Sequence, residues 1–199
     1  MILIGDSGVG KSSLMNRYMN SRFDSSSFTT IGVEFLNKEI ITEGRRFTVQ
    51  IWDTGGQERF RSLRTPFYRG SDCCILTFAL DDRASFANLH MWQKEFLHYS
   101  DVAGLANYPF IVLGTKADRP EHTRQVSNDE IEEWRQGNDS MCYFETSAKD
   151  NTNVNEAFQT AIHLMITNSK NQIHKRHSEQ SVDLSSTSGS QGKVSCCSS

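Results

Sequence analysis

Apolar residues in this chain fall into short runs that alternate with longer stretches of helical spacing. The runs predict buried strands, and the alternation of Phe47, Val49 and Ile51 predicts a strand with one buried face. The buried runs are Met1–Ile4, Cys73–Leu80 and Phe110–Leu113, and the helical spacing covers Ser12–Met19, Ala84–Tyr99 and Ile131–Trp134.

Capping and turn residues mark where several of these segments begin and end. Ser127 followed by Glu130 forms a capping box, which predicts a helix that opens at Ile131. Glu43-Gly44 predicts a turn between two adjacent strands, which would form the one antiparallel pair. The apolar face of a last helix is formed by Val154, Ala157, Phe158, Ala161, Ile162 and Met165.

The alternation of strands and helices predicts an α/β fold. A sheet built in this way is mostly parallel, carries helices on both faces and binds ligands at the carboxyl ends of its strands. We expect one folded domain at residues 1–168. From Ser169 to Ser199 the chain has ten serines, two glycines and no aromatic residue, so this segment is expected to be a flexible, disordered tail.

The composition is that of a soluble globular protein. The 199 residues are 37% hydrophobic and 23% charged, and the formal net charge is −3. A nucleic-acid-binding protein would carry a basic excess, which this chain lacks. No apolar run reaches the roughly 18 residues needed to cross a bilayer, and Met1–Ile4 is too short for a secretion signal.

The five cysteines do not form the spacing of a disulfide framework, which favours a reducing, cytosolic setting. Cys73, Cys74 and Cys142 stand in apolar runs and are predicted to be small core residues. Cys196 and Cys197 stand almost at the end of the chain.

The segment Gly5-Asp6-Ser7-Gly8-Val9-Gly10-Lys11-Ser12 matches the phosphate-binding loop pattern and lies between a predicted strand and a predicted helix. Its glycines let backbone N–H groups point at phosphate oxygens. The Lys11 ammonium can reach the β- and γ-phosphates, and the Ser12 hydroxyl can ligate Mg²⁺. This loop predicts a nucleoside triphosphate as ligand without choosing the base.

A second motif, Asp53-Thr54-Gly55-Gly56-Gln57, follows an apolar strand. A carboxylate at the end of that strand can hold Mg²⁺ through its water shell. Gly56 can bring a backbone N–H close to the γ-phosphate, and Gln57 can orient an attacking water molecule.

Two further segments indicate guanine as the base, and the first, Thr115-Lys116-Ala117-Asp118, follows the strand Phe110–Gly114. Guanine presents two adjacent hydrogen-bond donors, both of which the Asp118 carboxylate can accept, whereas adenine would leave this carboxylate unpaired. The stem of Lys116 can lie over the ring plane. Thr146-Ser147-Ala148-Lys149 follows the next strand and places the N–H of Ala148 where it can meet the guanine carbonyl.

These four motifs, in this order, resemble those of the Ras superfamily of small GTPases over residues 1–168. The segments 31–35, 59–63 and 67–70 resemble signatures of the Rab family, and 30–38 with 62–74 are most similar to its Rab nine subgroup. The resemblance implies a single P-loop NTPase domain with a six-stranded, mostly parallel sheet. It also implies GTP or GDP as bound nucleotide, Mg²⁺ as cofactor, and GTP hydrolysis that is slow without an activating protein.

The resemblance also assigns roles to residues. Gln57 is the catalytic residue, and Ser12, Thr30 and Asp53 ligate the metal, Thr30 in the GTP state alone. The nucleotide-binding residues are Gly8, Val9, Gly10, Lys11, Ser12, Ser13, Phe23, Thr30, Gly56, Thr115, Lys116, Asp118, Ser147, Ala148 and Lys149. The surface that effectors read is Ile31, Gly32, Val33, Glu34, Phe35, Trp52 and Phe67.

For the whole protein, the resemblance implies a switch that regulates vesicle and endosomal membrane traffic. Cys196 and Cys197 resemble the double-cysteine end that receives geranylgeranyl chains, and they also fit a loose Cys-a-a-X box. Implied partners are an exchange factor, an activating protein, a GDP-dissociation inhibitor or escort protein, and effectors. The expected location is the cytoplasmic face of late endosomal or Golgi membranes, with a cytosolic pool and no nucleic-acid partner.

Three features depart from the family pattern. Thr115 replaces the usual asparagine, and its shorter side chain is expected to weaken the link between the base and the phosphate loop. Gly55 replaces an alanine, which is expected to loosen the segment around it. The strand Met1–Ile4 is shorter than the typical five or six residues, which predicts a truncated, mis-started or divergent chain of reduced stability.

Two other functions remain open on the sequence. The departures at Thr115 and Gly55 are compatible with a pseudo-GTPase that no longer cycles and acts as a binding module. A P-loop kinase would share the phosphate loop, but it would need a phosphate-acceptor site and lid arginines.

Overall fold

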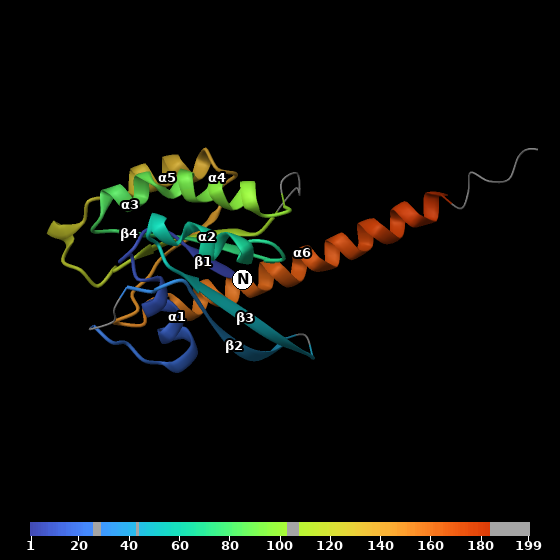
Figure 1. The fold of residues 1–199 in the computed structure, drawn as a ribbon, viewed down its shortest axis with the longest axis horizontal. Coiled ribbons are helices and arrows are strands. Elements are labelled where there is room, and N and C mark those ends of the chain that lie inside the picture. The colour runs from blue at the N-terminus through green and yellow to red at the C-terminus, as the bar shows by residue number, and fades with distance from the viewer. Residues whose placement is uncertain (26–28, 43, 103–107, 184–199) are drawn as a thin grey trace, which may run out of the picture.

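A computed structural model describes the chain at residues 1–25, 29–42, 44–102 and 108–183, with 171–183 described by their backbone alone. Six strands form one sheet in the order β2-β3-β1-β4-β5-β6, and β2 runs antiparallel to β3 while the other neighbours are parallel (Figure 1). The strands are β1 (Ile2–Ile4), β2 (Val33–Thr42), β3 (Arg45–Thr54), β4 (Cys74–Ala79), β5 (Phe110–Thr115) and β6 (Cys142–Glu145).

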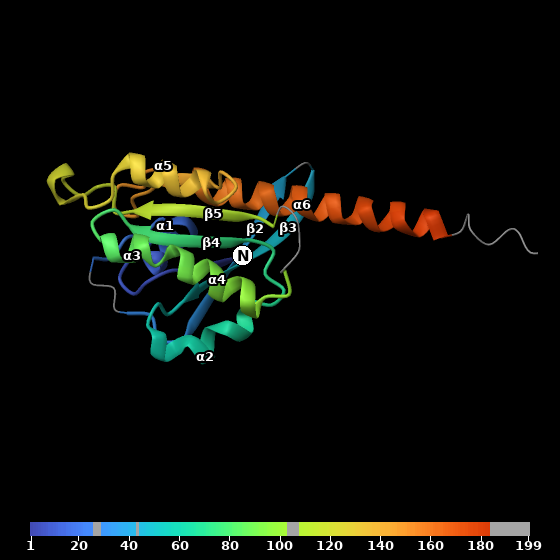
Figure 2. The same ribbon diagram turned by 90° about the horizontal axis from the view of Figure 1, so that it is seen from above.

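Helices cover both faces of this sheet. Figure 1 shows α3, α4 and α5 on one side of the strands and α1 on the other, and in Figure 2, seen from above, α3 and α4 lie in front and α1 lies behind. The helices are α1 (Lys11–Asn20), α2 (Arg61–Arg64), α3 (Arg83–Ala87), α4 (Leu89–Tyr99), α5 (Asn128–Gln136) and α6 (Val154–Asp183), with short 3₁₀ turns η1 (Glu58–Phe60), η2 (Thr65–Phe67) and η3 (Glu121–Thr123).

The central strands are apolar throughout because each of their faces meets a helix layer. In β1, Leu3 joins the core under α1 and α6, while Ile2 and Ile4 join the core under α4 and α5. All three side chains are fully buried. The α/β architecture predicted from strand–helix alternation is therefore confirmed, and the two cores hold the carboxyl ends of the strands in fixed positions.

Several predicted element boundaries are confirmed. Ser127 and Glu130 form a complete capping box, in which the Ser127 hydroxyl accepts from the Glu130 N–H and the Glu130 carboxylate accepts from the Ser127 N–H. β2 and β3 form the predicted antiparallel hairpin. Gly44 has a left-handed φ of 70° at its turn, whereas Glu43 lies outside the described residues.

Two helix predictions need correction. The predicted helix Ala84–Tyr99 is divided into α3 and α4 at Asn88, whose side chain donates a hydrogen bond of 2.8 Å to the Asp6 carboxylate. The tail predicted to be disordered from Ser169 begins as helix, because α6 continues to Asp183. The sequence has no glycine or proline between Val154 and Asp183 that would stop the helix.

Within the described ranges, no helix combines the length and the apolar character that a membrane span requires.

Candidate nucleotide-binding site

The loop between β1 and α1 takes a shape that needs glycine at three positions. Gly5, Gly8 and Gly10 have φ values of 146°, 78° and 101°. A Cβ atom on Gly5 would lie 2.0 Å from the Thr77 carbonyl oxygen of β4. The loop is thus wrapped closely against the end of the sheet, where the first helix begins.

Lys11, the first residue of α1, is buried inside this loop. Its ammonium donates hydrogen bonds to the carbonyls of Gly5, at 2.8 Å, and Asp6, at 2.7 Å. Burial lowers the pKa of Lys11 from 10.5 to about 8, against the opposite effect of the Asp53 and Asp6 carboxylates. A polyanionic ligand in the loop would give this ammonium the charged partner that the loop carbonyls do not supply.

Ser12, Thr30 and Asp53 converge from three different segments of the chain. The Ser12 hydroxyl donates to the Asp53 carboxylate at 2.5 Å and lies 2.6 Å from the Thr30 hydroxyl oxygen. The Thr30 hydroxyl also lies 3.1 Å from the same carboxylate oxygen.

The three oxygen-bearing side chains fit a hard divalent cation. Asp53 is fully buried, and its second oxygen, Oδ1, has no hydrogen-bond partner in the described part of the chain. Burial raises the pKa of this carboxyl group, while hydrogen bonds from Ser12 and Thr30 and the charge of Lys11 lower it. A cation would offset the cost of burying the ionised carboxylate. Two of the three side chains contribute hydroxyl oxygens and one contributes a carboxylate.

The loop after β3 lies against both the phosphate loop and the segment that carries Thr30. The N–H of Gly55 donates to the Gly32 carbonyl at 2.8 Å, and a Cβ on Gly55 would approach the Thr30 carbonyl oxygen to 2.8 Å. A Cβ on Gly56 would lie 2.3 Å from the backbone nitrogen of Ser7. Gly55 therefore allows close backbone contact in this conformation, and its predicted loosening of the segment stays a prediction.

Two adjoining cavities lie over these loops. The first, of about 310 Å³, is lined by residues predicted to contact the base, including Phe23, Lys116, Asp118, Ala148 and Lys149. The second, of about 290 Å³, is lined by the phosphate loop together with Thr30 and Gly56. The two share Gly8, Gly10, Ser13, Ser25, Lys116 and Arg119. Together they suit an elongated ligand with an aromatic end and a polyanionic end.

Gln57 does not line either of these cavities. It lines a neighbouring cavity of about 430 Å³ toward α4, together with Asp6, Arg64 and Trp92. This third cavity shares Ser7 and Gly56 with the phosphate cavity. The predicted catalytic side chain thus lies beside the predicted phosphate position, on its α4 side.

The segment predicted to select the base is held by side-chain contacts. Asp118 accepts a hydrogen bond of 2.8 Å from the Ser147 hydroxyl, and the ammonium of Lys149 lies 3.9 Å from its other carboxylate oxygen. Lys116 has a left-handed φ of 62° and pairs with Asp81 at 3.1 Å. The carboxylate of Asp118 is thereby fixed at the cavity wall.

Thr115 connects the base segment to the phosphate loop. Its hydroxyl donates a hydrogen bond to the carbonyl of Val9, which is itself buried. The threonine therefore makes the link that its shorter side chain was expected to weaken. The consequence for nucleotide affinity stays a prediction.

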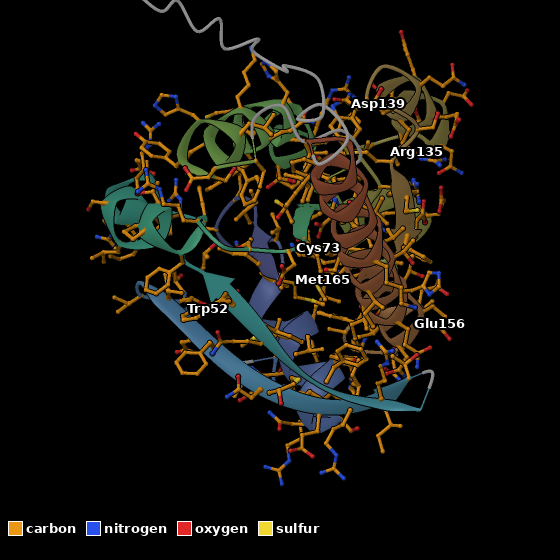
Figure 3. The ribbon with its side chains drawn as sticks, turned by 90° about the vertical axis from the view of Figure 1, so that its right-hand side faces the viewer. Trp52, Cys73, Arg135, Asp139, Glu156 and Met165 are labelled. Atoms are coloured by element: carbon orange, nitrogen blue, oxygen red, sulfur yellow. The ribbon has the colours of Figure 1, made fainter. Side chains whose placement is uncertain are left out.

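Aromatic side chains of β2, β3 and η2 gather at one surface. The rings of Phe35 and Phe67 each lie 4.7 Å from the Trp52 ring, measured between centroids. Figure 3 shows Trp52 near the end of β3, away from Met165 on α6. Phe35 is 50% exposed and the neighbouring Ile31 is 76% exposed. Of the remaining residues of the predicted effector surface, Gly32 precedes β2, and Val33 and Glu34 are its first two residues.

Sequence reasoning missed residues that support the site from behind. Arg17 on α1 donates to the carbonyls of Ala148 and Lys149 at 2.5 and 3.0 Å. The Asp6 carboxylate accepts from Trp92 at 2.6 Å as well as from Asn88. Spacing gave no signal for these contacts, because each joins residues more than 80 positions apart.

The two predicted lipidation residues, Cys196 and Cys197, lie outside the described residues.

Comparison with known proteins places this site in context. The family model described as the Ras family matches residues 1–167. The chain is 53% identical over 197 residues to mouse Ras-related protein Rab-9B, a match that covers 99% of this chain and 96% of the relative. It is 57% identical over 174 residues to rat Ras-related protein Rab-9A, a match that covers 87% of this chain and 86% of the relative. Ras-related protein Rab7 of Cenchrus ciliaris is 42% identical over 198 residues, with 99% and 95% covered.

Proposed function

Because this chain belongs to the Ras family, and within it to the Rab-9 group of Rab proteins, we propose that it is a molecular switch whose surface differs between its GTP-bound and GDP-bound forms. Members of the family hydrolyse GTP, and this chain is a small GTPase. In the switch, one half of the site holds guanine and the other half senses the γ-phosphate.

The convergence of Ser12, Thr30 and Asp53 is the observation that carries the proposal. Thr30 reaches the phosphate-loop serine at 2.6 Å, although it belongs to a separate loop that leads into the exposed aromatic surface. Mg²⁺, when bound by these three residues, would neutralise charge on the phosphate oxygens. Loss of the γ-phosphate would release Thr30 and the loop after β3, so that the surface they support changes.

Hydrolysis forms a bond between a water oxygen and the γ-phosphorus and breaks the bond from that phosphorus to the β,γ-bridging oxygen, giving GDP and inorganic phosphate. Lys11 and the N–H groups of the phosphate loop stabilise the negative charge that spreads over the transferred group. Gln57 orients the attacking water. The ammonium of Lys11 is buried and already turned into the loop, which supports its role in stabilising the charge.

Guanine selection rests on Asp118, with Ser147, Ala148 and Lys149 beside it. The contact from Ser147 orients the carboxylate toward a pair of adjacent donors on the base. Phe23 packs against the ring edge, and Lys116 lies along its plane. Adenine would leave the carboxylate unpaired, which costs roughly 1–3 kcal/mol.

At the level of the cell, we propose a role in vesicle and endosomal membrane traffic, at the cytoplasmic face of late endosomal or Golgi membranes. Its similarity to Rab-9A and Rab-9B supports this assignment. Lipid chains on Cys196 and Cys197 would attach the protein to the membrane. An exchange factor, an activating protein, a GDP-dissociation inhibitor or escort protein, and effectors at the aromatic surface would act on the cycle.

A nucleotide-selectivity assay tests the site. The purified protein should retain labelled GTP and GDP against dilution in the presence of Mg²⁺, and excess ATP should not displace them. Asp118→Asn should shift the preference toward xanthine nucleotides, because the amide can donate to the second carbonyl of xanthine. Equal GTP affinity in Asp118→Asn and the parent would show that Asp118 does not read the base.

Phosphate release separates the switch from a pseudo-GTPase. The parent loaded with GTP should release phosphate slowly, and Gln57→Leu should release it more slowly while it still binds GTP. A parent that binds GTP but releases no phosphate, even with an activating protein, would instead be a binding module.

A further inference from the structure

A buried ion pair lies behind the nucleotide site, where the chemistry of hydrolysis does not require one. Arg64, at the end of α2, is 2% exposed, and Glu95, on α4, is 9% exposed. Charged side chains are seldom buried to this extent unless their hydrogen bonds are satisfied. The contacts of this pair therefore indicate what it holds in place.

One side of the Arg64 guanidinium is fixed to α4. Its Nε donates to Glu95 Oε1 at 3.0 Å, and one terminal nitrogen donates to Glu95 Oε2 at 3.2 Å. The Tyr68 hydroxyl donates to the same carboxylate at 2.8 Å. Burial and the Glu95 carboxylate raise the pKa of Tyr68, so that its hydroxyl remains a donor. The guanidinium also lies 4.4 Å from the ring centre of Trp92.

The other side of the guanidinium holds the loop that carries Gln57. The second terminal nitrogen donates to the carbonyl of Gln57 at 2.9 Å and to the carbonyl of Gly55 at 3.3 Å. These carbonyls flank Gly56, whose backbone lies against the phosphate loop. One planar group thus joins α4 to the backbone on both sides of Gly56.

The same helix also holds the phosphate loop. Asn88, next to α4, and Trp92, within it, both donate to the Asp6 carboxylate, at 2.8 and 2.6 Å. The carbonyl of Asp6 in turn accepts from Lys11. The helix α4 therefore fixes the positions of the phosphate loop and the Gln57 loop relative to each other.

We propose that Arg64, held by Glu95, is a positioning residue for GTP hydrolysis, which fixes the backbone of Gly55 and Gln57 so that the Gln57 side chain can orient the attacking water. This inference rests on the proposed function. A small displacement of a water-positioning group is enough to slow hydrolysis by roughly 10- to 100-fold. An apolar pair of similar size would fill the same space and often preserves stability, but it could not bind the two carbonyls.

The main test replaces the pair with apolar side chains, in Arg64→Met/Glu95→Leu. Single-turnover phosphate release from bound GTP should fall roughly 10-fold or more, while GDP dissociation stays close to that of the parent. Hydrogen exchange should rise at residues 55–60 and stay unchanged in β4 and β5. A purely structural role would instead change stability and exchange throughout the domain.

Two further variants keep the test decisive. Arg64→Lys retains the charge beside Glu95, but its single nitrogen cannot reach Glu95 and both carbonyls. Hydrolysis should therefore fall in this variant as well, and it replaces the double variant as the test if the double variant does not fold. Arg61→Met is the matched control. Arg61 also pairs with Glu95, at 3.0 Å, but it is half exposed and makes no hydrogen bond to either carbonyl in the described part of the chain. Hydrolysis in this variant should stay within about twofold of the parent.

Phosphate release within about twofold of the parent in a folded Arg64→Met/Glu95→Leu or Arg64→Lys protein would overturn the inference and leave the proposed function intact. Absence of phosphate release from the GTP-loaded parent, even with an activating protein, would overturn the proposed function, and the inference with it.

Discussion

Asp53 shows at the scale of a single residue how this chain is adapted to a ligand. Its carboxylate is fully buried, accepts hydrogen bonds from Ser12 and Thr30 at one oxygen, and has no hydrogen-bond partner for the other within the described residues. Burial raises its pKa. A raised folded-state pKa makes a stability contribution that is present at low pH and lost as the pH rises through that pKa. Ionisation of this carboxylate therefore destabilises the ligand-free fold.

We predict from this that Asp53→Asn separates folding from function. Without nucleotide and Mg²⁺, the variant should melt at the same temperature as the parent or above it at pH 7, because a buried charge has been removed. Its retention of GDP should no longer respond to added Mg²⁺. Asp129→Asn, an exposed site on α5, serves as the control that removes one charge elsewhere. A ligand-free variant that melts well below the parent at pH 7 would contradict this account of Asp53.

Several residues singled out by sequence motifs, among them Lys11 and Asp118, line the two adjoining cavities, whereas the residues that support these cavities were not predicted. Glycine spacing and strand ends indicated Lys11, Asp53 and Asp118, because these motifs are local. Arg64 and Glu95 gave no comparable signal, since an arginine on a short helix and a glutamate on an amphipathic one are usually exposed. Their burial depends on how α2 docks against α4, which is set by tertiary packing.

At the scale of elements, α1 joins the two halves of the site. It begins at Lys11 in the phosphate loop, and Arg17 one and a half turns later donates to the carbonyls of Ala148 and Lys149. The same guanidinium donates to the Ser21 carbonyl at 2.9 Å, near the end of the helix. Its hydrogen bonds hold the segment whose Ala148 N–H is proposed to meet the base.

Arg17→Met should accelerate GDP dissociation by about tenfold, since the loss of charge-assisted hydrogen bonds costs on the order of 1.5–3 kcal/mol. The hydrolysis rate of GTP that remains bound should change little, because Arg17 contacts neither the phosphate loop nor Gln57 in the described structure. Release of a fluorescent GDP analogue measures the effect. Arg22→Met removes an exposed arginine from the following loop and should leave dissociation unchanged. Equal rates in Arg17→Met and Arg22→Met would refute this role.

Element boundaries were predicted less well than the elements themselves. The apolar face of α6 is buried as expected through Ile162, but the helix continues to Asp183. Serine content suggested a flexible tail from Ser169, whereas the polar residues that follow include good helix formers and no breaker. Local composition identifies where a core ends, but it does not identify where a helix ends.

For the molecule as a whole, we propose that the folded domain and the chain terminus have separate tasks. The domain carries the proposed nucleotide site and the aromatic surface at Phe35, Trp52 and Phe67. Figure 1 shows α6 extending away from the sheet. The terminus would carry the lipid chains that attach the protein to a membrane.

Membrane attachment should depend on both terminal thiols. Cys196→Ser/Cys197→Ser should bind GDP and GTP like the parent but remain in the supernatant when membranes are pelleted from cells. Each single variant should attach more weakly than the parent, because one lipid chain gives marginal, reversible binding. Pelleting of the double variant at the level of the parent would mean that another anchor exists.

We propose that the γ-phosphate orders two loops that GDP leaves free, and hydrogen exchange measures this ordering. Exchange is measured for two complexes of the protein, one with Mg²⁺ and GDP and the other with Mg²⁺ and a non-hydrolysable GTP analogue. We predict stronger protection at residues 29–35 and 55–63 in the analogue complex, with β4 and β5 equally protected in both. Equal protection of the two loops in both complexes would contradict the account, because the bound nucleotide would then leave the proposed effector surface unchanged.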